Sequence, residues 1–234
     1  MSSAEPMAES RIILLGVCSD THGYVAPAFD PATVSAFLHA GDLYDAAVSR
    51  QALPHDPMGS WLAACTVPAF LVRGNHDHRD PLGIFERHEN VTGRIVPIAP
   101  GLLVAGLGFA PREFYDLPGE TDLKPMCRDV LRLARRLIGT SDRVVLLTHY
   151  PAKLPGVYLE HEASEGEAFD CVRELIEELG PVAVIQGHVH EWFGQTHLLQ
   201  MLSRPVLLVN PGPLGGILQI DMDKGDASYK AAGG

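Results

Sequence analysis

Short apolar runs that stop abruptly at glycine and polar residues are the feature of this sequence that most constrains its fold. The first run, residues 11–19, ends at Asp20-Thr21-His22-Gly23, and the run over residues 69–73 ends at Gly74-Asn75-His76-Asp77. Runs of this length, bounded by turn residues, are typical of buried strands. The same pattern predicts strands at residues 37–40, 102–107, 144–148, 182–186, 206–209 and 216–221.

Helical patterns lie between several of these runs. Residues 124–138 and 169–179 repeat apolar side chains with a period of about 3.6, and basic residues stand between the apolar ones in the first of them. Gly180-Pro181 ends the second helix. A further helix is expected within residues 45–64, where Pro54 and Pro57 interrupt it. Strands that alternate with helices predict a layered α/β fold.

Polar side chains gather where these predicted strands end. In layered α/β sheets, ligands bind beyond the carboxyl ends of the strands. The clusters contain residues suited to metal binding, namely Asp20, His22, Asp42, Asn75, His149, His188 and His190. Taken singly, each has another interpretation, because Asp and Asn are common in turns and a given histidine is more often a surface or core residue. Taken together, they predict a metal centre.

The donor atoms in this set indicate which ions the centre binds. All are oxygen or imidazole ligands and none is a cysteine, which suits Mn²⁺, Fe²⁺ or Zn²⁺ and disfavours a structural zinc-thiolate site. The set is too large for one tetrahedral ion. Two ions about 3.5–4 Å apart, bridged by one carboxylate and one hydroxide, would use every ligand. Two divalent ions are therefore expected, with Mn²⁺ as the first choice and Fe²⁺, Zn²⁺ or Ni²⁺ as alternatives.

The order of these motifs resembles that of the calcineurin-like metallophosphoesterase superfamily. The signature of that superfamily is Asp-x-His, Gly-Asp, Gly-Asn-His-Asp/Glu, His and Gly-His-x-His. The chain has Asp20-Thr21-His22, Gly41-Asp42, Gly74-Asn75-His76-Asp77, His149 and Gly187-His188-Val189-His190. A single motif such as Gly41-Asp42 has little specificity, but the full set in this order is highly specific.

The resemblance implies a fold and a role for each residue. The fold would be a four-layer α/β/β/α sandwich of two packed mixed sheets flanked by helices, with the dimetal site at the strand C-terminal edge. Asp20, His22 and His190 would bind the first metal, Asn75, His149 and His188 the second, and Asp42 would bridge them. His76 would face the substrate as acid and transition-state stabiliser. Asp77 would hold the His76 ring, although a capping role for Asp77 is also open.

The predicted function is metal-dependent hydrolysis of phosphate esters by a metal-bridging hydroxide. A small phosphate ester is the expected substrate, a diester in preference to a monoester, and cyclic nucleotides are one candidate. The chain has no large insertion to form a cap, which would leave the metals open to varied substrates. The alternatives are a phosphomonoesterase and a non-catalytic metal-binding scaffold of the same fold, and the presence of His76 argues against the scaffold. A DNA nuclease is disfavoured by the net charge of −11 and by the lack of an evident basic stripe.

The remaining expectations concern organisation and location. Residues 11–223 are predicted to form a single domain between flexible tails at residues 1–10 and 224–234. The first residues do not resemble a signal peptide, and no apolar run approaches the roughly 20 residues of a membrane span, so a cytoplasmic protein without membrane contact is expected. The four cysteines, which form no Cys-x-x-Cys pair, are predicted to be buried free thiols. The oligomeric state is left open.

Three further positions near the motifs carry predictions. His39 is expected to pack beneath the site. Arg73 either anchors the following turn or contacts phosphate. Trp192 and Phe193, which follow the last motif, either stack on a nucleobase or pack against the sheet, and packing is favoured.

Overall fold

Two mixed sheets form the centre of the protein, and each has six strands. The computed structural model describes residues 11–44, 56–77, 88–108, 123–152, 162–201 and 204–233. Sheet A has the order β12-β11-β1-β2-β3-β4, and sheet B has the order β5-β6-β7-β8-β10-β9. The strands of sheet A are β1 (Ile12–Cys18), β2 (Ala36–His39), β3 (Ala69–Leu71), β4 (His88–Asn90), β11 (Gly216–Asp221) and β12 (Asp226–Ala231). Those of sheet B are β5 (Ile95–Ala99), β6 (Leu102–Leu107), β7 (Arg143–Thr148), β8 (Ala183–Ile185), β9 (Gln195–Gln200) and β10 (Pro205–Asn210).

Four neighbouring strands of each sheet run parallel. In sheet A, β1, β2, β3 and β4 are parallel neighbours, and β11 joins β1 in the antiparallel direction. In sheet B, β6, β7, β8 and β10 are parallel, whereas β5 and β9 are antiparallel edge strands. Because parallel strands end at the same edge of a sheet, the polar clusters that follow them are brought to one side of the molecule.

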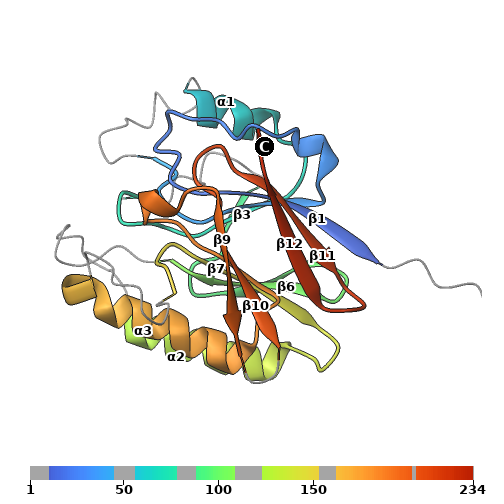
Figure 1. Ribbon diagram of the computed structural model, residues 1–234, viewed down its shortest axis with the longest axis vertical. Coiled ribbons are helices and arrows are strands. Elements are labelled where there is room, and N and C mark those ends of the chain that lie inside the picture. The colour runs from blue at the N-terminus through green and yellow to red at the C-terminus, as the bar shows by residue number, and fades with distance from the viewer. Residues whose placement is uncertain are drawn as a thin grey trace, which may run out of the picture.

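Helices cover the outer face of each sheet, which gives four layers (Figure 1). α1 (Pro57–Ala64) packs on sheet A, while α2 (Leu123–Leu137) and α3 (Glu162–Leu179) pack on sheet B. A third apolar cluster fills the space between the sheets and includes Leu15 of β1 and Val145 of β7. The predicted four-layer sandwich is therefore confirmed. Two single-turn 3₁₀ helices, η1 (Pro31–Thr33) and η4 (His190–Trp192), lie in the connections.

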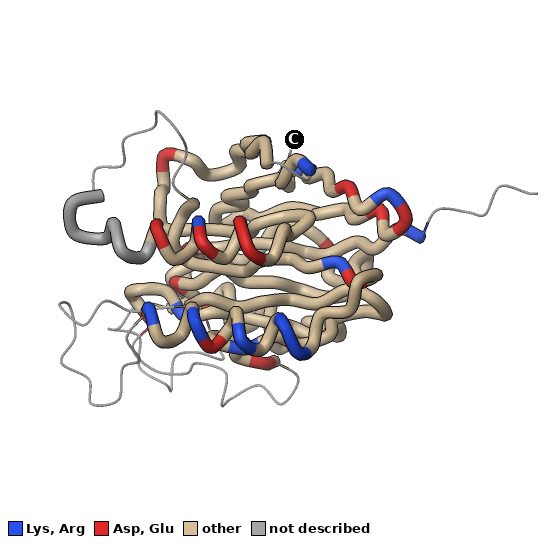
Figure 2. The backbone as a smooth tube through the Cα atoms, turned by 90° about the horizontal axis from the view of Figure 1, so that it is seen from below, with Lys and Arg blue, Asp and Glu red and all other residues tan. Residues whose placement is uncertain are grey.

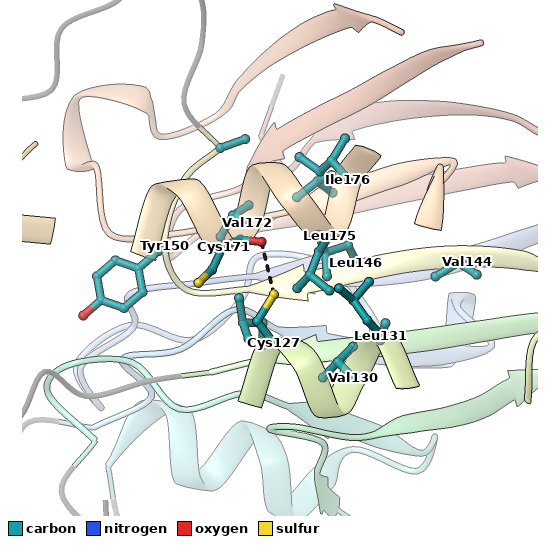
Figure 3. Packing of buried hydrophobic residues seen from close by; sticks show 14 of the residues in the cluster. Cys127, Val130, Leu131, Val144, Leu146, Tyr150, Cys171, Val172, Leu175 and Ile176 are labelled. Carbon is teal, nitrogen blue, oxygen red and sulfur yellow. Dashed lines mark hydrogen bonds between the residues drawn. The ribbon is translucent and has the colours of Figure 1, made fainter. Parts of the chain in front are cut away.

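The predicted amphipathic pattern explains why α2 and α3 lie where they do. Val130 of α2 and Leu175 of α3 are fully buried, and Figure 3 shows them beside Leu146 of sheet B. Each such side chain contributes roughly 1.5–3 kcal/mol when it leaves water. The Cys127 thiol lies in the same layer and donates to the Cys171 carbonyl oxygen at 3.7 Å. All four cysteines are free and buried, as predicted.

The outer face of the α2–α3 layer is divided by charge (Figure 2). The exposed side chains of α2 include Lys124, Arg128, Arg132, Arg135 and Arg136, and those of α3 include Asp170, Glu174, Glu177 and Glu178. An ion pair of 3.7 Å joins Arg135 to Glu178. The expectation that the chain lacks a basic stripe is therefore wrong. The acidic helix beside the stripe reduces its attraction for a polyanion, so nucleic acid remains a disfavoured partner.

The C-terminal segment differs from its prediction as a flexible tail. Residues 226–231 form β12, which pairs with β11 along all of its length from Asp226 to Ala231. The backbone N–H of Gly225 closes the preceding turn on the Asp221 carbonyl oxygen at 2.8 Å. Exposed and half-buried residues alternate along β12, as they do along β9, because both are edge strands. Polar edge strands lack an apolar run, which is why the sequence pattern did not reveal β4, β9 and β12.

Two predictions fall outside the described residues. The N-terminal tail of residues 1–10 is one, and the part of the third predicted helix that lies at residues 45–55 is the other. Among the described segments, no helix has the length and apolar character that a membrane crossing requires.

Candidate metal centre

Loops at the ends of five parallel strands bring the predicted site residues together. β1, β2 and β3 end level with one another, since Cys18 pairs with His39 and His39 pairs with Leu71. In sheet B, Leu147 of β7 pairs with Ile185 of β8. The residues that follow these strands therefore meet at the same edge, and all nine predicted site residues lie in described segments.

The backbone of these loops is strained at the candidate ligands. Four non-glycine residues of the described chain have a positive φ: Asp20 (53°), His22 (48°), Asp42 (55°) and His188 (69°). A side chain in this left-handed region costs about 1–3 kcal/mol, and such strain is found mainly at functional sites. All four are predicted metal ligands. The strain is therefore confined to residues whose side chains are aimed into the site.

The first group of donor atoms comes from Asp20, His22 and His190, which lie within 4.8 Å of one another. Asp20 Oδ1 accepts a hydrogen bond from the His188 backbone N–H at 3.0 Å and lies 3.7 Å from His190 Nε2. Asp20 Oδ2 is buried and has no hydrogen-bond partner among the described residues. A buried carboxylate oxygen with no donor is unfavourable in an apolar setting, and a cation would satisfy it.

The second group comes from Asp42, Asn75, His149 and His188. Asn75 Oδ1 lies 2.8 Å from His149 Nε2 and 3.1 Å from His188 Nδ1. His149 Nε2 is also 3.5 Å from Asp42 Oδ2. Because Asp20, Asp42 and His149 form a further cluster within 4.8 Å, the two groups are contiguous.

The hydrogen bonds of His149 show why this second group fits a cation. Its Nδ1 lies 2.9 Å from the carbonyl oxygen of Ala40, which can only accept, so Nδ1 carries the proton. In the neutral ring, Nε2 then presents its lone pair toward the oxygens of Asn75 and Asp42. Three acceptor atoms that face one another, namely His149 Nε2, Asn75 Oδ1 and Asp42 Oδ2, repel each other. A cation bound between them would remove this repulsion because all three would coordinate it. The donor set therefore fits the divalent ions expected from the sequence.

The carboxyl groups of the centre have displaced pKa values. Burial, together with the neighbouring charges of Asp77 and Asp20, raises the pKa of Asp42 well above its usual value. Burial also acts to raise the pKa of Asp20, but the hydrogen bond with His190 and the proximity of His149 outweigh it and lower this pKa to about 2. Bound cations would favour the ionised form of both groups.

The glycines of the motifs make room for the candidate ligands. A Cβ atom on Gly41 would lie 2.6 Å from His149 Nδ1, and one on Gly187 would lie 2.6 Å from Asp20 Oδ2. A Cβ atom on Gly74 would overlap Asp42 Oδ1. Three ligands thus pack directly against a backbone that has no side chain, which explains why glycine stands before each of these motifs.

His76 and Asp77 occupy different environments. The His76 backbone N–H donates to Asp42 Oδ1 at 2.8 Å, and its ring lies edge-on to the His22 ring with 5.0 Å between centroids. The Asp77 carboxylate instead accepts from the backbone N–H groups of Asp42 (2.8 Å), Gly74 (2.8 Å) and Tyr44 (3.1 Å). Both carboxylate oxygens accept hydrogen bonds from this backbone, and that Asp77 also holds the His76 ring stays a prediction. The capping role is the one that the geometry supports.

Arg73 and the residues after the last motif also have clear positions. The Arg73 guanidinium donates to the Asp77 carbonyl oxygen at 2.8 and 3.2 Å, so it anchors the turn. Trp192 packs against the apolar cluster of sheet B, and the Phe193 ring stacks on His190 with 4.7 Å between centroids and an angle of 33°. The packing alternative is therefore favoured for Trp192, whereas Phe193 lies against a candidate ligand and both of its alternatives stay open.

Asn210 supports the candidate site and was not predicted from the sequence. Its buried side-chain Nδ2 donates to the Val189 carbonyl oxygen at 2.9 Å and to that of Gly187 at 3.4 Å. These two residues flank His188, so Asn210 holds the turn that presents this ligand. The signal was present, because Asn210-Pro211-Gly212 is one more polar cluster at the end of a predicted strand.

The family model described as calcineurin-like phosphoesterase matches residues 13–192. The search of curated proteins found no match. A solved structure of protein TT1561 from Thermus thermophilus is 15% identical, with a TM-score of 0.60, and the alignment covers 95% of this chain and 100% of that one. A conserved uncharacterised protein of Streptococcus pneumoniae, described as a predicted phosphoesterase, is 13% identical with a TM-score of 0.40, over 94% and 98% of the chains.

Proposed function

The chain belongs to the calcineurin-like phosphoesterase family, and from this we infer that it hydrolyses small phosphodiesters with the help of two divalent metal ions. Membership of the family makes it a metal-dependent phosphoesterase, an enzyme that cleaves phosphoric ester bonds. The observation that carries the proposal is the convergence of two contiguous groups of donor atoms beside His76.

Each of the two groups of donor atoms would hold one ion. One ion would be held by Asp20, His22 and His190, and the other by Asn75, His149 and His188. Asp42 lies between the groups, 3.5 Å from His149 and 4.0 Å from His22, which supports a bridging role. Mn²⁺ is the ion we propose, because carboxylate, amide and imidazole ligands in one site suit it, and Fe²⁺, Zn²⁺ and Ni²⁺ are the alternatives.

The chemistry that bound ions supply is polarisation of the phosphoryl group and activation of water. The contribution of the chain itself comes from His76. Its backbone N–H is fixed to Asp42, and its half-buried ring stands at the rim beside His22. From there the imidazole can stabilise negative charge on the phosphoryl oxygens and pass a proton to the departing ester oxygen.

Charge supports a diester in preference to a monoester. Two divalent ions would bring about +4, the carboxylates of Asp20 and Asp42 would remove about 2, and the hydroxide expected between the ions would remove about 1, which leaves about +1. A small positive excess in an otherwise acidic protein, whose net charge is −11, matches a singly charged diester better than a doubly charged monoester. Cyclic nucleotides are one class of diester that this charge fits. The scaffold alternative is disfavoured because His76 and the complete ligand set are present.

The test compares two model substrates. Turnover of bis-p-nitrophenyl phosphate and of p-nitrophenyl phosphate is measured with and without Mn²⁺, for the wild type and for His76→Ala. We expect metal-dependent diester turnover that exceeds monoester turnover, and a fall of about 10²–10⁴-fold in kcat for the variant. Arg132→Ala, at an exposed position on α2, is the control and should retain wild-type turnover. Equal activity of His76→Ala and wild type would contradict the role of His76, and faster monoester turnover would contradict the substrate class.

A further inference from the structure

One buried histidine lies beneath the candidate metal centre and is not among the predicted ligands. His39 is the last residue of β2, its side chain is fully buried, and it stands between β1 and β3 in the sheet. Its Nε2 lies 3.0 Å from the Thr21 hydroxyl, and its Nδ1 accepts from the Gly41 backbone N–H at 3.2 Å. Thr21 separates two candidate ligands, Asp20 and His22, and Gly41 precedes a third, Asp42.

A count of hydrogens fixes the form of the His39 ring. The Thr21 hydroxyl has one proton, and it donates that proton to the Leu43 carbonyl oxygen at 3.1 Å. The hydroxyl oxygen is therefore the acceptor toward His39, so His39 Nε2 carries a proton. The Gly41 N–H is a donor, so His39 Nδ1 presents a lone pair. Both contacts are satisfied only by the neutral ring protonated on Nε2.

These contacts join two loops that are strained. The Asp20 backbone N–H donates to the Gly41 carbonyl oxygen at 3.0 Å, and the His22 N–H donates to the Asp42 carbonyl oxygen at 3.0 Å. Asp20, His22 and Asp42 all have left-handed backbone conformations. Loops in such conformations persist only where surrounding contacts determine them. The imidazole is a further link between the loops, in addition to these two backbone hydrogen bonds and the hydrogen bond from the Thr21 hydroxyl to the Leu43 carbonyl oxygen.

We propose that His39 is a positioning residue of the metal centre, whose neutral Nε2–H ring ties the Asp20–His22 loop to the Gly41–Asp42 loop. It acts through Thr21 and Gly41 and touches neither metal nor substrate. The inference rests on the proposed function only in that the loops are taken to hold metal ions. Beyond that, the position of Asp20 and His22 relative to the bridging Asp42 is inferred to depend on the His39 ring.

The test separates the two hydrogen bonds of His39. The amide nitrogen of glutamine can replace Nε2, so His39→Gln keeps the donor to Thr21, whereas the oxygen of asparagine can replace Nδ1, so His39→Asn keeps the acceptor for Gly41. His39→Leu keeps neither. Thr21→Val removes the hydroxyl at similar volume, and Thr21→Ser, which retains it, is the matched control. The affinity for Mn²⁺ and the number of ions bound are measured by titration calorimetry, and apo-protein unfolding is followed by thermal melting in chelator.

The expected result is a graded loss of metal affinity. Loss of a group that orients metal ligands weakens binding by about 10- to 100-fold, so His39→Leu should fall in this range. His39→Asn, His39→Gln and Thr21→Val should lie between it and the wild type, and Thr21→Ser should bind as the wild type does. The double variant His39→Asn with Thr21→Val should bind Mn²⁺ no more weakly than the weaker-binding single variant. Both substitutions remove the same hydrogen bond, the one between His39 Nε2 and the Thr21 hydroxyl, so their effects should not add.

Two outcomes would overturn the proposal. One is unchanged Mn²⁺ affinity in His39→Leu and Thr21→Val, provided that the wild type binds its ions. The other is an NMR spectrum of ¹⁵N-labelled wild type that shows His39 protonated on Nδ1, and this readout does not depend on metal or turnover. Failure of the wild type itself to bind Mn²⁺ would instead refute the metal centre. The two failures are therefore distinguishable.

Discussion

Gly74→Ala tests how tightly the backbone encloses the bridging position. The new Cβ would overlap Asp42 Oδ1 and lie 2.8 Å from Asp42 Cγ and 2.5 Å from Asp42 N. The Asp42 backbone cannot retreat easily, because its N–H donates to the buried Asp77 carboxylate at 2.8 Å. The Asp42 side chain must therefore rotate, and it then loses the hydrogen bond of 2.8 Å from the His76 N–H. Gly74 has no positive φ, so the effect is steric and does not arise from backbone strain.

The magnitude follows from the hydrogen bond that is lost. A hydrogen bond to a charged group contributes about 1.5–3 kcal/mol. Since 1.4 kcal/mol corresponds to a factor of ten, the affinity for Mn²⁺ should fall roughly 10- to 100-fold. Diester turnover at limiting Mn²⁺ should fall with it. Titration calorimetry and turnover of bis-p-nitrophenyl phosphate across a range of Mn²⁺ concentrations measure the two effects.

Gly139→Ala is the matched control for this change. Gly139 also has no positive φ, and its new Cβ would meet only the end of the Asp142 side chain, at 3.1 Å. It should bind Mn²⁺ and turn over diester as the wild type does. If Gly74→Ala behaves like Gly139→Ala in both assays, the Asp42 carboxylate is not held against Gly74, and its proposed bridging role loses its structural support.

The remaining predictions concern charge and support around the ligands. Asp42→Asn should melt at a higher temperature than the wild type in chelator at neutral pH, because burial beside Asp77 and Asp20 raises the pKa of Asp42 and makes its ionised form unfavourable in the folded protein. This advantage should shrink as pH falls and the wild-type carboxyl becomes protonated, and the variant should lose the rise in Tm that Mn²⁺ gives the wild type. A wild type that is the more stable of the two in chelator at neutral pH would contradict this. Asn210→Ala removes the donors to the Gly187 and Val189 carbonyls and should weaken Mn²⁺ binding by about tenfold or more, as measured by calorimetry; unchanged affinity would show that the turn around His188 holds its shape without Asn210.

The layered fold and the side chains that meet at the candidate centre could be predicted from the amino-acid sequence. Asp20, Asp42, Asn75, His149 and His188 each follow a predicted strand closely, and the strand was visible from its apolar run. Parallel strands end at the same edge of a sheet, so a local pattern was enough to predict which side chains would lie close together. The left-handed residues and the motif glycines occur where these runs end.

Which groups support the candidate ligands depends on contacts that form only in the folded chain. Asp77 follows His76 directly, yet its carboxylate binds the N–H groups of Asp42 and Tyr44, which lie 35 and 33 positions away. The Asp20 carboxylate accepts from His188 across 168 positions. A periodic pattern reports which face of an element is buried, but it carries no information on which distant backbone fills the space beside it. The apolar pattern does not detect edge strands such as β12, because pairing with β11 through the backbone requires no apolar run.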